Sequence, residues 1–552
     1  MRAWSKALNA NDNAAAGKLF AKSARVVQPP VIDGLLSTPA LATEFNNTLP
    51  CAGRVVHMTI EGDTVIATFV LGHRPKHTCD APGGAEGEEA AERAGGLVPQ
   101  VVLGQFLRYS PKMIVPPTGA ALLRDTSGSG FADADTFCVD ARGHPLFVAE
   151  EAVVVARAPG RFDVLGGIAD YAGGLVLGFP IGQAVLAAAQ VVTDGRVIAV
   201  SGRRRVAVPA CDLVEAPLDE LARRFSGRDS WAAYVLGPVA LLAREERLAI
   251  TGLRLLVSSS VPEGKGLGSS AAVEIAVAQA TAGALGYRLE PRRLALLGHR
   301  AEQLVARAPC GSMDQMTATY GEEAHILALI CRPAEIIGSF ALPPGLTVWG
   351  IDSGARHAVR DAPYRRARCA TFMGKALLGV DTDYLTSLRP GDVEAERLPE
   401  RMTGAEFLRL RDGVEDEMSA IESTVEYPVR AATLHPVEEQ VRVETFLQVL
   451  EQPITRRRAQ VLGDLMAASH AGYSRCGLGT PTTDRIVDAV RAAGWERGLV
   501  GARVSGGGSG GTVVVLGREE AEPVARRLAK RLGGGLVVGT SAGASSFGTR
   551  VV

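Results

Sequence analysis

Apolar residues in the middle of the chain fall into short runs followed by long alanine-rich stretches. Residues 253–257 read LRLLV, which predicts a strand, and residues 271–285 are rich in alanine with one glutamate and no proline, which predicts a long buried helix. Between these stretches the chain reads GKGLGSSAA over residues 264–272. The pattern therefore predicts a strand, a glycine-rich loop and a helix in immediate succession.

This glycine-rich loop has the properties of an anion-binding site. Glycine lets the backbone approach a ligand closely, and the first turn of a helix offers free N–H groups and the positive end of the helix dipole. We expect a phosphate cradle to be formed by Gly264, Gly266, Leu267, Gly268, Ser269, Ser270 and Ala271. Glycine-rich turns also serve ordinary strand-to-helix connections, so a purely structural role stays open. The spacing matches neither GxxxxGK(S/T) nor GxGxxG, which disfavours the two commonest nucleotide-binding folds.

The alternation of strands and helices continues from residue 148 to the end of the chain. Short apolar runs predict further strands at 150–167, 346–353, 498–505 and 512–516. Longer stretches predict helices at 231–243, 294–305, 363–378, 456–470 and 483–493. The first of these strands enters a Pro-Gly turn at 159–160, and the last two enclose a second glycine-rich loop, GGGSGG, at 506–511. Residues 171–193 carry no charge, but glycine and proline breakers favour two buried strands joined by a turn over a membrane-spanning helix.

Residues 1–118 follow a different pattern. Helical periodicity over 4–20 is followed by alternating strands over 54–71 and a further strand candidate at 100–109, which together predict an α+β cone. The stretches KALNANDNAAAGKLFA, LPCAGRVV and EGDTVIATFVLGHR resemble a SnoaL-like member of the NTF2-like superfamily, a resemblance that implies a fold and no particular activity. Residues 119–147, with TSGSG at 126–130, are predicted to be a linker.

Composition narrows the class of protein. The 552 residues are 47% hydrophobic and 22% charged with a formal net charge of −1, values typical of a soluble globular protein and unfavourable for binding nucleic acid through bulk charge. The eight cysteines form no CxxC pair, which argues against a zinc site or a disulfide framework. The first residues lack the apolar core of a signal peptide. We therefore expect a cytoplasmic protein with no membrane or nucleic-acid partner, and the sequence does not predict its oligomeric state.

Three motifs follow one another in order along the second part of the chain: RAPGR to DY over 157–171, the phosphate cradle, and VSGGGSGG over 504–511. In this order and spacing they resemble the GHMP small-molecule kinases, over about residues 148–552. The resemblance implies an α+β, two-lobed fold, with a ribosomal S5 domain 2-like lobe at 148–340 and a ferredoxin-like lobe at 341–552. It also implies that the cradle wraps the phosphates of ATP, with Mg²⁺ as cofactor. The third motif would add a loop of Gly506, Gly507, Gly508 and Gly510.

Within this family the galactokinase pattern fits best, because Glu302 precedes Asp314 by twelve residues. The resemblance implies that Glu302 and Ser270, or Ser269 in its place, hold Mg²⁺. It further implies that Asp314 accepts or orients the proton of the sugar's anomeric hydroxyl and that Arg161 pairs with Asp314 and the transferring phosphoryl group. Two plainer roles stay open. Asp314 could cap a helix, and Glu302 could form a surface ion pair with a nearby arginine such as Arg300.

The first motif departs from the galactokinase pattern GRxNLxGEHxDY at the residues that reach the sugar's C6 hydroxyl. Gly167 and Ile168 replace the Glu-His pair, which would leave that hydroxyl unpaired and disfavours galactose. L-Arabinose shares galactose's hydroxyl arrangement at C2 to C4 and lacks C6. Asp170 is retained and would accept hydrogen bonds from ring hydroxyls. Tyr364, in the shortened element YRRARC, is also expected to approach the sugar.

Longer stretches, including GGIADYAGGLVL, CGSMDQM and HPVEEQVRVETF, resemble the kinase portion of the plant L-arabinokinases. This resemblance implies an ATP- and Mg²⁺-dependent sugar-1-kinase that converts L-arabinose to β-L-arabinose 1-phosphate, with galactokinase activity as the alternative. A catalytically silent sugar-sensing protein is a third possibility. The expected ligands are a small sugar and ATP. The plant proteins carry a glycosyltransferase-like region ahead of the kinase where this chain carries its NTF2-like segment, so their regulation does not transfer.

Overall fold

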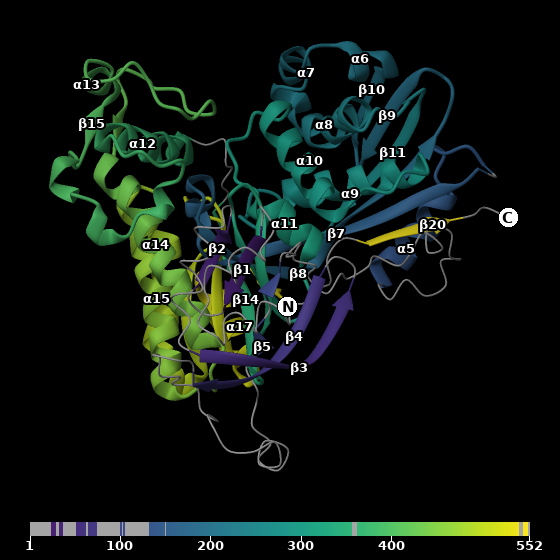
Figure 1. Ribbon diagram of the computed structural model, residues 1–552. Coiled ribbons are helices and arrows are strands. Elements are labelled where there is room, and N and C mark those ends of the chain that lie inside the picture. Colours follow the sequence, from purple (N-terminus) through teal and green to yellow (C-terminus); the bar gives the residue numbers. More distant parts are fainter. Residues whose placement is uncertain are drawn as a thin grey trace. The chain divides into compact units, whose positions relative to one another are not determined.

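The computed structural model describes residues 24–28, 32–36, 51–61, 64–73, 100–101, 103–104, 132–149, 151–355, 362–539 and 545–549. The chain divides into two compact units, Met1–Val115 and Pro116–Val552 (Figure 1).

The described backbone of the first unit consists of two small antiparallel sheets, in the strand orders β2-β1-β6 and β3-β4-β5. The strands are β1 (Ala24–Gln28), β2 (Ile32–Leu36), β3 (Cys51–Glu61), β4 (Thr64–His73), β5 (Gln100–Val101) and β6 (Leu103–Gly104). Pairing of β3 with β4 confirms the paired strands predicted over 54–71. The helix predicted at 4–20 and the rest of the NTF2-like cone lie outside the described residues.

The second unit opens with a large sheet that carries the first motif. Its strands run in the order β10-β9-β11-β8-β12-β13, and β7 pairs with β8 and with β20. They are β7 (Val153–Leu165), β8 (Leu175–Val191), β9 (Arg196–Ser201), β10 (Arg204–Pro209), β11 (Leu253–Ser259), β12 (His325–Ile330), β13 (Glu335–Ala341) and β20 (Ser545–Thr549). The sheet therefore places the strand of the first motif beside the last described strand of the chain.

Two predictions for the start of this sheet are wrong. The Pro-Gly pair at 159–160 does not turn the chain, because β7 runs on to Leu165 with only a shift of register against β8 between Pro159 and Arg161. The uncharged stretch 171–193 is not two strands. It is the end of a 3₁₀ turn, η2 (Gly167–Ala172), followed by the single strand β8, which is long enough to pair with β7, β11 and β12 at once.

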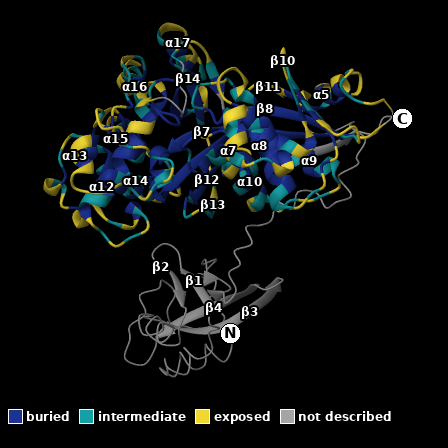
Figure 2. Ribbon diagram, turned by 90° about the horizontal axis from the view of Figure 1, so that it is seen from above, coloured by how far each residue is buried: buried dark blue, intermediate teal, exposed yellow. Residues whose placement is uncertain are grey.

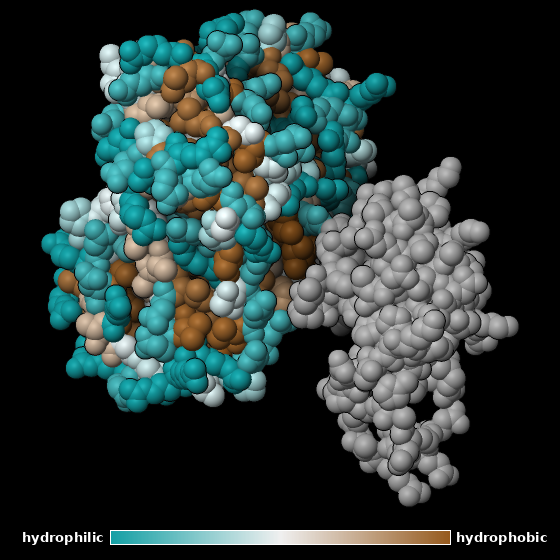
Figure 3. Space-filling model, turned by 60° about the vertical axis from the view of Figure 1, so that its left-hand side comes forward, coloured by the Kyte–Doolittle hydropathy of each residue, from teal (hydrophilic) through white to brown (hydrophobic). Residues whose placement is uncertain are grey.

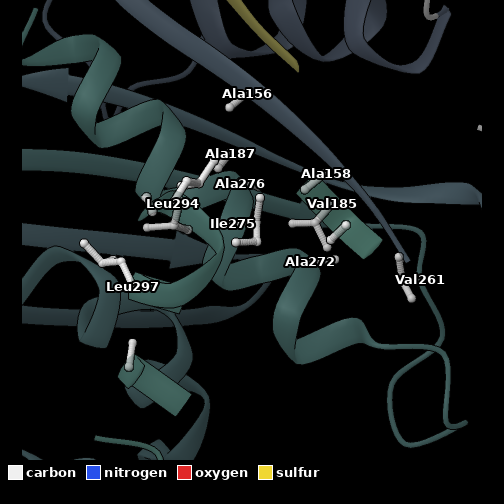
Figure 4. Packing of buried hydrophobic residues seen from close by; sticks show 14 of the residues in the cluster. Ala156, Ala158, Val185, Ala187, Val261, Ala272, Ile275, Ala276, Leu294 and Leu297 are labelled. Carbon is white, nitrogen blue, oxygen red and sulfur yellow. The ribbon is translucent and has the colours of Figure 1, made fainter. Parts of the chain in front are cut away.

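Helices α8 (Ser230–Glu245), α9 (Ser269–Ala284) and α10 (Pro291–Leu304) lie together against one face of this sheet (Figure 1). Each confirms a predicted helix. Alanine dominates α9 because it is buried between β7, β8 and the two neighbouring helices, where larger side chains have no room. Figure 4 shows Ile275 and Ala276 of α9 close to Val185 and Ala187 of β8. Shorter helices complete this part: α6 (Ala210–Glu215), α7 (Leu218–Arg224) and α11 (Met313–Tyr320).

Part of the segment predicted as a linker is a helix, α5 (Ala132–Arg142), so the linker prediction for 119–147 is wrong there. Phe137 and Cys138 pack with Val155 and Ala188, whereas Ala156 and Ala187 belong to the core under α9. Because successive strand residues point to opposite faces, α5 covers the face of the sheet opposite to α9.

A second sheet carries the third motif. Its antiparallel strands run in the order β17-β18-β14-β19. They are β14 (Leu346–Asp352), β17 (Leu499–Val504), β18 (Thr512–Arg518) and β19 (Leu536–Val538). Trp349 and Val515 pack with residues of α16 (Pro481–Ala493) and α17 (Glu522–Leu532) on one face, and Val514 packs with α15 (Arg456–Arg475) on the other. The strands and helices predicted here are confirmed.

A helical layer lies between β14 and β17 in the chain, two strands of the second sheet. It consists of α12 (Ala362–Leu378), which was predicted, and α14 (Val429–Leu450), which was not. The charged stretch between them forms only short elements: η4 (Leu385–Ser387), η5 (Pro390–Asp392), η6 (Ala395–Arg397), β15 (Met402–Thr403), α13 (Gly404–Leu408) and β16 (Glu426–Tyr427). A cluster of buried residues from α12, α14 and η2 ties this layer to the first motif.

Burial in the second unit follows the two sheets and the inner faces of the helices, while the outer faces of α13, α16 and α17 are exposed (Figure 2). Hydrophilic residues surround separate hydrophobic patches on the face of this unit drawn in Figure 3. Across the part of the chain that the structure describes, no helix is both long and apolar enough to span a bilayer.

Candidate active site

The phosphate cradle lies between β11 and the first turn of α9, which confirms the predicted succession of strand, loop and helix. Gly264, Gly266 and Gly268 have φ angles of 69°, 68° and 69°, a region of backbone conformation that residues other than glycine rarely adopt. Gly268 is the N-cap residue of α9, and no side chain caps this helix end. The first N–H groups of α9, at Ser269, Ser270 and Ala271, are therefore available to an anion.

The third-motif loop packs directly against the cradle. Ser505 Oγ donates a hydrogen bond to the Gly266 carbonyl at 2.9 Å, and the Thr512 N–H donates to the Lys265 carbonyl at 2.9 Å. A Cβ on Gly266 would lie only 2.5 Å from the Ser505 carbonyl oxygen. The structure therefore brings the two glycine-rich loops together, with no room for side chains where they touch. Loop residues Gly506, Gly507, Gly508 and Gly510 follow Ser505 between β17 and β18.

Arg161 connects the first motif to both the cradle and Asp314. Its Nε and Nη2 each donate to a different carboxylate oxygen of Asp314 at 2.7 Å, and its Nη1 donates to the Gly266 carbonyl at 2.6 Å. Burial lowers the pKa of Arg161, but the charges of Asp314 and Asp163 more than offset this effect. The pKa is therefore raised, and the guanidinium stays charged. Asp314 lies in the first turn of α11, whose N-cap residue is Ser312. The predicted ion pair is confirmed, and the catalytic roles of the two residues stay predictions.

Glu302 is a buried residue of α10, 3% exposed, so the alternative of a surface ion pair does not hold. Arg300 pairs with Glu245 instead, at 3.0 Å. Burial raises the pKa of Glu302 and the charge of Asp314 raises it further, while a hydrogen bond from Ser270 opposes the rise. The two residues predicted to hold the metal are therefore in contact.

A second buried carboxylate, Glu274 of α9, lies beside Glu302. The Gln315 amide Nε2 donates to Glu302 Oε2 at 2.6 Å and to Glu274 Oε2 at 3.0 Å. Burial and the neighbouring charge of Glu302 raise the pKa of Glu274 well above its ordinary value. Sequence reasoning missed this residue, although a single glutamate in an alanine-rich buried helix was a visible signal.

Asp170 belongs to η2 and lies near Asp314. Burial, with the charge of Asp314 as the next cause, raises its pKa from 3.8 to about 7. A Cβ on Gly311, three residues before Asp314, would overlap the Asp170 carboxylate. Tyr364 of α12 is 4% exposed, and burial together with the charge of Asp170 raises its pKa well above the ordinary value. Asp170, Tyr364 and Asp314 are thus brought into one neighbourhood, as a shared sugar site requires.

Gly167 and Ile168 form the first turn of η2. Ile168 is 2% exposed and packs into the cluster that also holds Tyr364 and Tyr473, so its side chain is a packing element. Gly167 has a φ of 46°, and a Cβ there would overlap the hydroxyl of Tyr473. Their direct contact with a sugar stays a prediction.

Two further charged residues were missed. Lys265 stands inside the cradle motif and donates to Asp352 of β14 at 2.7 Å, which ties the loop to the second sheet. Arg368 stands in the quoted YRRARC element, donates to the Pro309 carbonyl at 3.0 Å and forms two hydrogen bonds of 2.8 Å with Asp416. It therefore holds the turn that leads to Gly311. Lys265 and Arg368 both belong to motifs recognised in the sequence. Their partners lie too far away along the chain to be predicted from the sequence.

Three regions of the chain match models of known protein families. Residues 233–322 match the GHMP kinases N terminal domain, residues 450–545 match the GHMP kinases C terminal domain, and residues 145–191 match the galactokinase galactose-binding signature. L-Arabinokinase of Arabidopsis thaliana is 36% identical over 450 residues, which cover 68% of this chain and 43% of that protein. The chain thus spans less than half of the length of this plant relative.

A galactokinase of Streptomyces coelicolor is 32% identical over 387 residues, which cover 68% of this chain and 88% of that protein. The crystal structure of Lactococcus lactis galactokinase complexed with galactose superimposes with a TM-score of 0.58 at 19% identity, covering 75% of this chain and 98% of that one. The likeness to this structure shows the shared α+β fold, and the sequence matches show the family. The chain belongs to the GHMP kinases and is a sugar kinase of the galactokinase and L-arabinokinase type.

Proposed function

We propose that this protein transfers the γ-phosphoryl group of ATP to the anomeric hydroxyl of L-arabinose and forms β-L-arabinose 1-phosphate. The observation that carries the kinase chemistry is the ion pair of Arg161 and Asp314, which is anchored to the Gly266 carbonyl inside the cradle. Support for the sugar comes from the L-arabinokinase relative and from the Gly167-Ile168 pair.

In the proposed step, the anomeric oxygen bonds to the γ-phosphorus while the bond from that phosphorus to the bridging oxygen breaks and ADP leaves. Asp314 takes the hydroxyl proton or orients it. Arg161 keeps the Asp314 carboxylate in place with two N–H donors, and its third contact fixes the distance from that carboxylate to the cradle. The start of α9 and the third-motif loop supply backbone N–H groups to the phosphates.

The metal-binding residues fit Mg²⁺ by their chemistry. Glu302 and Ser270 offer oxygen donors in contact with one another beside the first turn of α9, and Mg²⁺ prefers oxygen ligands. When bound, Mg²⁺ neutralises phosphate charge. Gln315 holds Glu302 from the protein side, so the carboxylate is oriented before any ligand arrives. Asp170 and Tyr364 are assigned to the sugar hydroxyls.

Galactokinase activity is the second candidate, and the match of residues 145–191 to the galactose-binding signature favours it. A panel of sugars with ATP, with the position of phosphate on the product determined, separates the two. We expect a higher kcat/KM for L-arabinose than for D-galactose and phosphate on C1. The reverse preference would overturn the assignment of the sugar. A protein that binds sugar but consumes no ATP with any sugar of the panel would favour the catalytically silent sugar-sensing protein.

Three further assignments are proposals as well. We assign residues 1–118 to an NTF2-like domain, place the division of the kinase into lobes near residue 340, and assign the protein to the cytoplasm. The sequence patterns described above support each of them.

A further inference from the structure

Tyr473 of α15 joins two parts of the site that are far apart in the chain. Its hydroxyl accepts a hydrogen bond from the Ile168 N–H at 2.9 Å and donates one to the Gly506 carbonyl at 2.9 Å. Ile168 belongs to η2 on the sugar side, and Gly506 belongs to the third-motif loop on the phosphate side. The side chain is fully buried, so water cannot replace either bond cheaply.

The approach of this hydroxyl depends on Gly167. The hydroxyl occupies the space that a Cβ at position 167 would need, so a residue with a side chain there would displace Tyr473 or distort η2. The positive φ of 46° at this position disfavours other residues as well. Gly167 therefore has a packing role that is independent of any contact with a sugar.

An ion pair reinforces the junction. Asp163 Oδ1 accepts from the Gly167 N–H at 3.2 Å and from Arg503 Nη1 at 2.6 Å, while Oδ2 accepts from the Gly506 N–H at 3.1 Å. Both charged side chains are completely buried, and the Arg503 guanidinium lies 4.9 Å from the centre of the Tyr473 ring. The same turn and the same loop are thus linked by the Tyr473 hydroxyl and, separately, by the Asp163 carboxylate.

The third-motif loop passes this constraint to the cradle. A Cβ on Gly506 would lie 3.1 Å from the Gly266 carbonyl oxygen and 3.4 Å from Arg161 Nη2. Backbone that is packed this closely cannot shift without moving its neighbours. A change in the position of η2 therefore reaches the cradle through Gly506.

We propose that Tyr473 is a positioning residue that couples the sugar site to the phosphate-binding loops. Sugar held against η2 fixes Gly506 in the position that suits the triphosphate, and nucleotide on the loops fixes η2 for the sugar. Coupling of this kind is reciprocal, so each ligand tightens the binding of the other by the same factor. The inference rests on the proposed function in one respect, that a sugar contacts the region of η2 and a nucleotide contacts the cradle.

Tyr473→Phe tests this, because it removes only the hydroxyl. Dissociation constants for ADP are measured with and without L-arabinose, and those for L-arabinose with and without ADP, alongside kcat and both KM values. We expect each ligand to tighten the other about tenfold in the unmodified protein and less than about twofold in the variant. The affinity for each ligand alone should change less than about twofold. A general loss of structure would weaken the binding of each ligand alone as well, so it would not produce this combination.

Tyr427→Phe is the matched control. Tyr427 is also a buried tyrosine, 2% exposed, and its hydroxyl accepts at 2.9 Å from the N–H of Glu422, a residue of neither η2 nor the third-motif loop. The Tyr427→Phe variant should lower Tm about as much as Tyr473→Phe does and keep the mutual tightening of ADP and L-arabinose. Equal loss of coupling in both variants, or full coupling in Tyr473→Phe, would overturn the proposal.

Asp163→Asn provides a second route if Tyr473→Phe does not fold. The amide keeps one acceptor oxygen and loses the other, so we expect partial loss of coupling, and unchanged coupling would count against the junction. Failure of the proposed function looks different. Unmodified protein that phosphorylates no sugar contradicts that function, whereas protein that phosphorylates a sugar without mutual tightening contradicts only this inference.

Discussion

Arg161 and Asp314 are 153 positions apart in the chain and meet through two hydrogen bonds of 2.7 Å. Arg161 is 5% exposed as a side chain and Asp314 is 23% exposed, so the pair is protected on the arginine side and accessible on the aspartate side. An accessible carboxylate held by a buried cation suits a group that has to meet a substrate.

Asp314→Ala should lower kcat by roughly a thousandfold, because a positioned acid or base typically contributes 10²- to 10⁴-fold. ATP affinity should change little, since the cradle keeps its own contacts. The measurement is steady-state turnover together with nucleotide binding. Asp133→Ala is the matched control, because Asp133 also pairs with an arginine of β7, Arg157, at 3.0 Å. A variant at Asp314 with near-normal turnover would remove this residue from its role.

Asp170→Asn should change how stability depends on pH. Burial gives Asp170 a pKa of about 7 in the folded protein against an ordinary 3.8, so the folded state holds a proton that the unfolded chain releases between these values. Stability from this group is therefore present at low pH and is lost as the pH rises through about 7. The variant has no such loss, so its Tm relative to the unmodified protein should rise by roughly 2–4 °C between about pH 5 and about pH 8. A difference in Tm that is the same at both pH values contradicts the shifted pKa.

Glu302→Gln should raise the Mg²⁺ concentration needed for half-maximal rate by at least about tenfold, because an amide is a weaker ligand than a carboxylate. The test is a magnesium titration at saturating sugar and ATP. Glu290→Gln, at the N-cap of the same helix, should leave the titration unchanged. An unaltered midpoint in Glu302→Gln would show that the metal is held elsewhere.

Gly374→Ala should destabilise the protein by about 1–3 kcal/mol through overpacking. A Cβ at this position of α12 would overlap Thr433 Oγ1 of α14, so the two helices would have to move apart. Urea unfolding gives the free energy. Gly143→Ala is the comparison, since a Cβ there meets no atom within 4 Å, and it should be close to neutral. Equal stability of both variants would contradict the close packing of α12 on α14.

The parts of the site that could be predicted from the sequence are those in which local chemistry determines local structure. The three glycines of the cradle need positive φ values and the helix after them needs small residues, so Gly264, Gly266 and Gly268 could be identified before their surroundings were known. The pairing of Arg161 with Asp314 came from a family motif, not from any pattern in the residues themselves.

The parts that could not be predicted depend on partners far along the chain. Gly167 was interpreted as the loss of a sugar contact, but the absence of a side chain there also leaves space for the Tyr473 hydroxyl. The hydrogen bond from the Ile168 N–H to that hydroxyl joins residues 305 positions apart. Helix α14 was missed because it contains Pro436, and a proline inside an apolar pattern normally argues against a continuous helix. Helix α5 was missed because its buried face consists mainly of small residues, which give a weak apolar signal.

Pairing of β20 with β7 has a consequence for folding. Residues 545–549 lie against residues 153–157, so the strand that carries Arg161 reaches its final neighbours only after residues 545–549 have been synthesised. Until then one edge of β7 has no strand beside it, and open strand edges pair readily with other chains. A nascent chain can thus contain all three motifs and still expose an unpaired edge of β7. Until residues 545–549 emerge, this edge favours association with other chains.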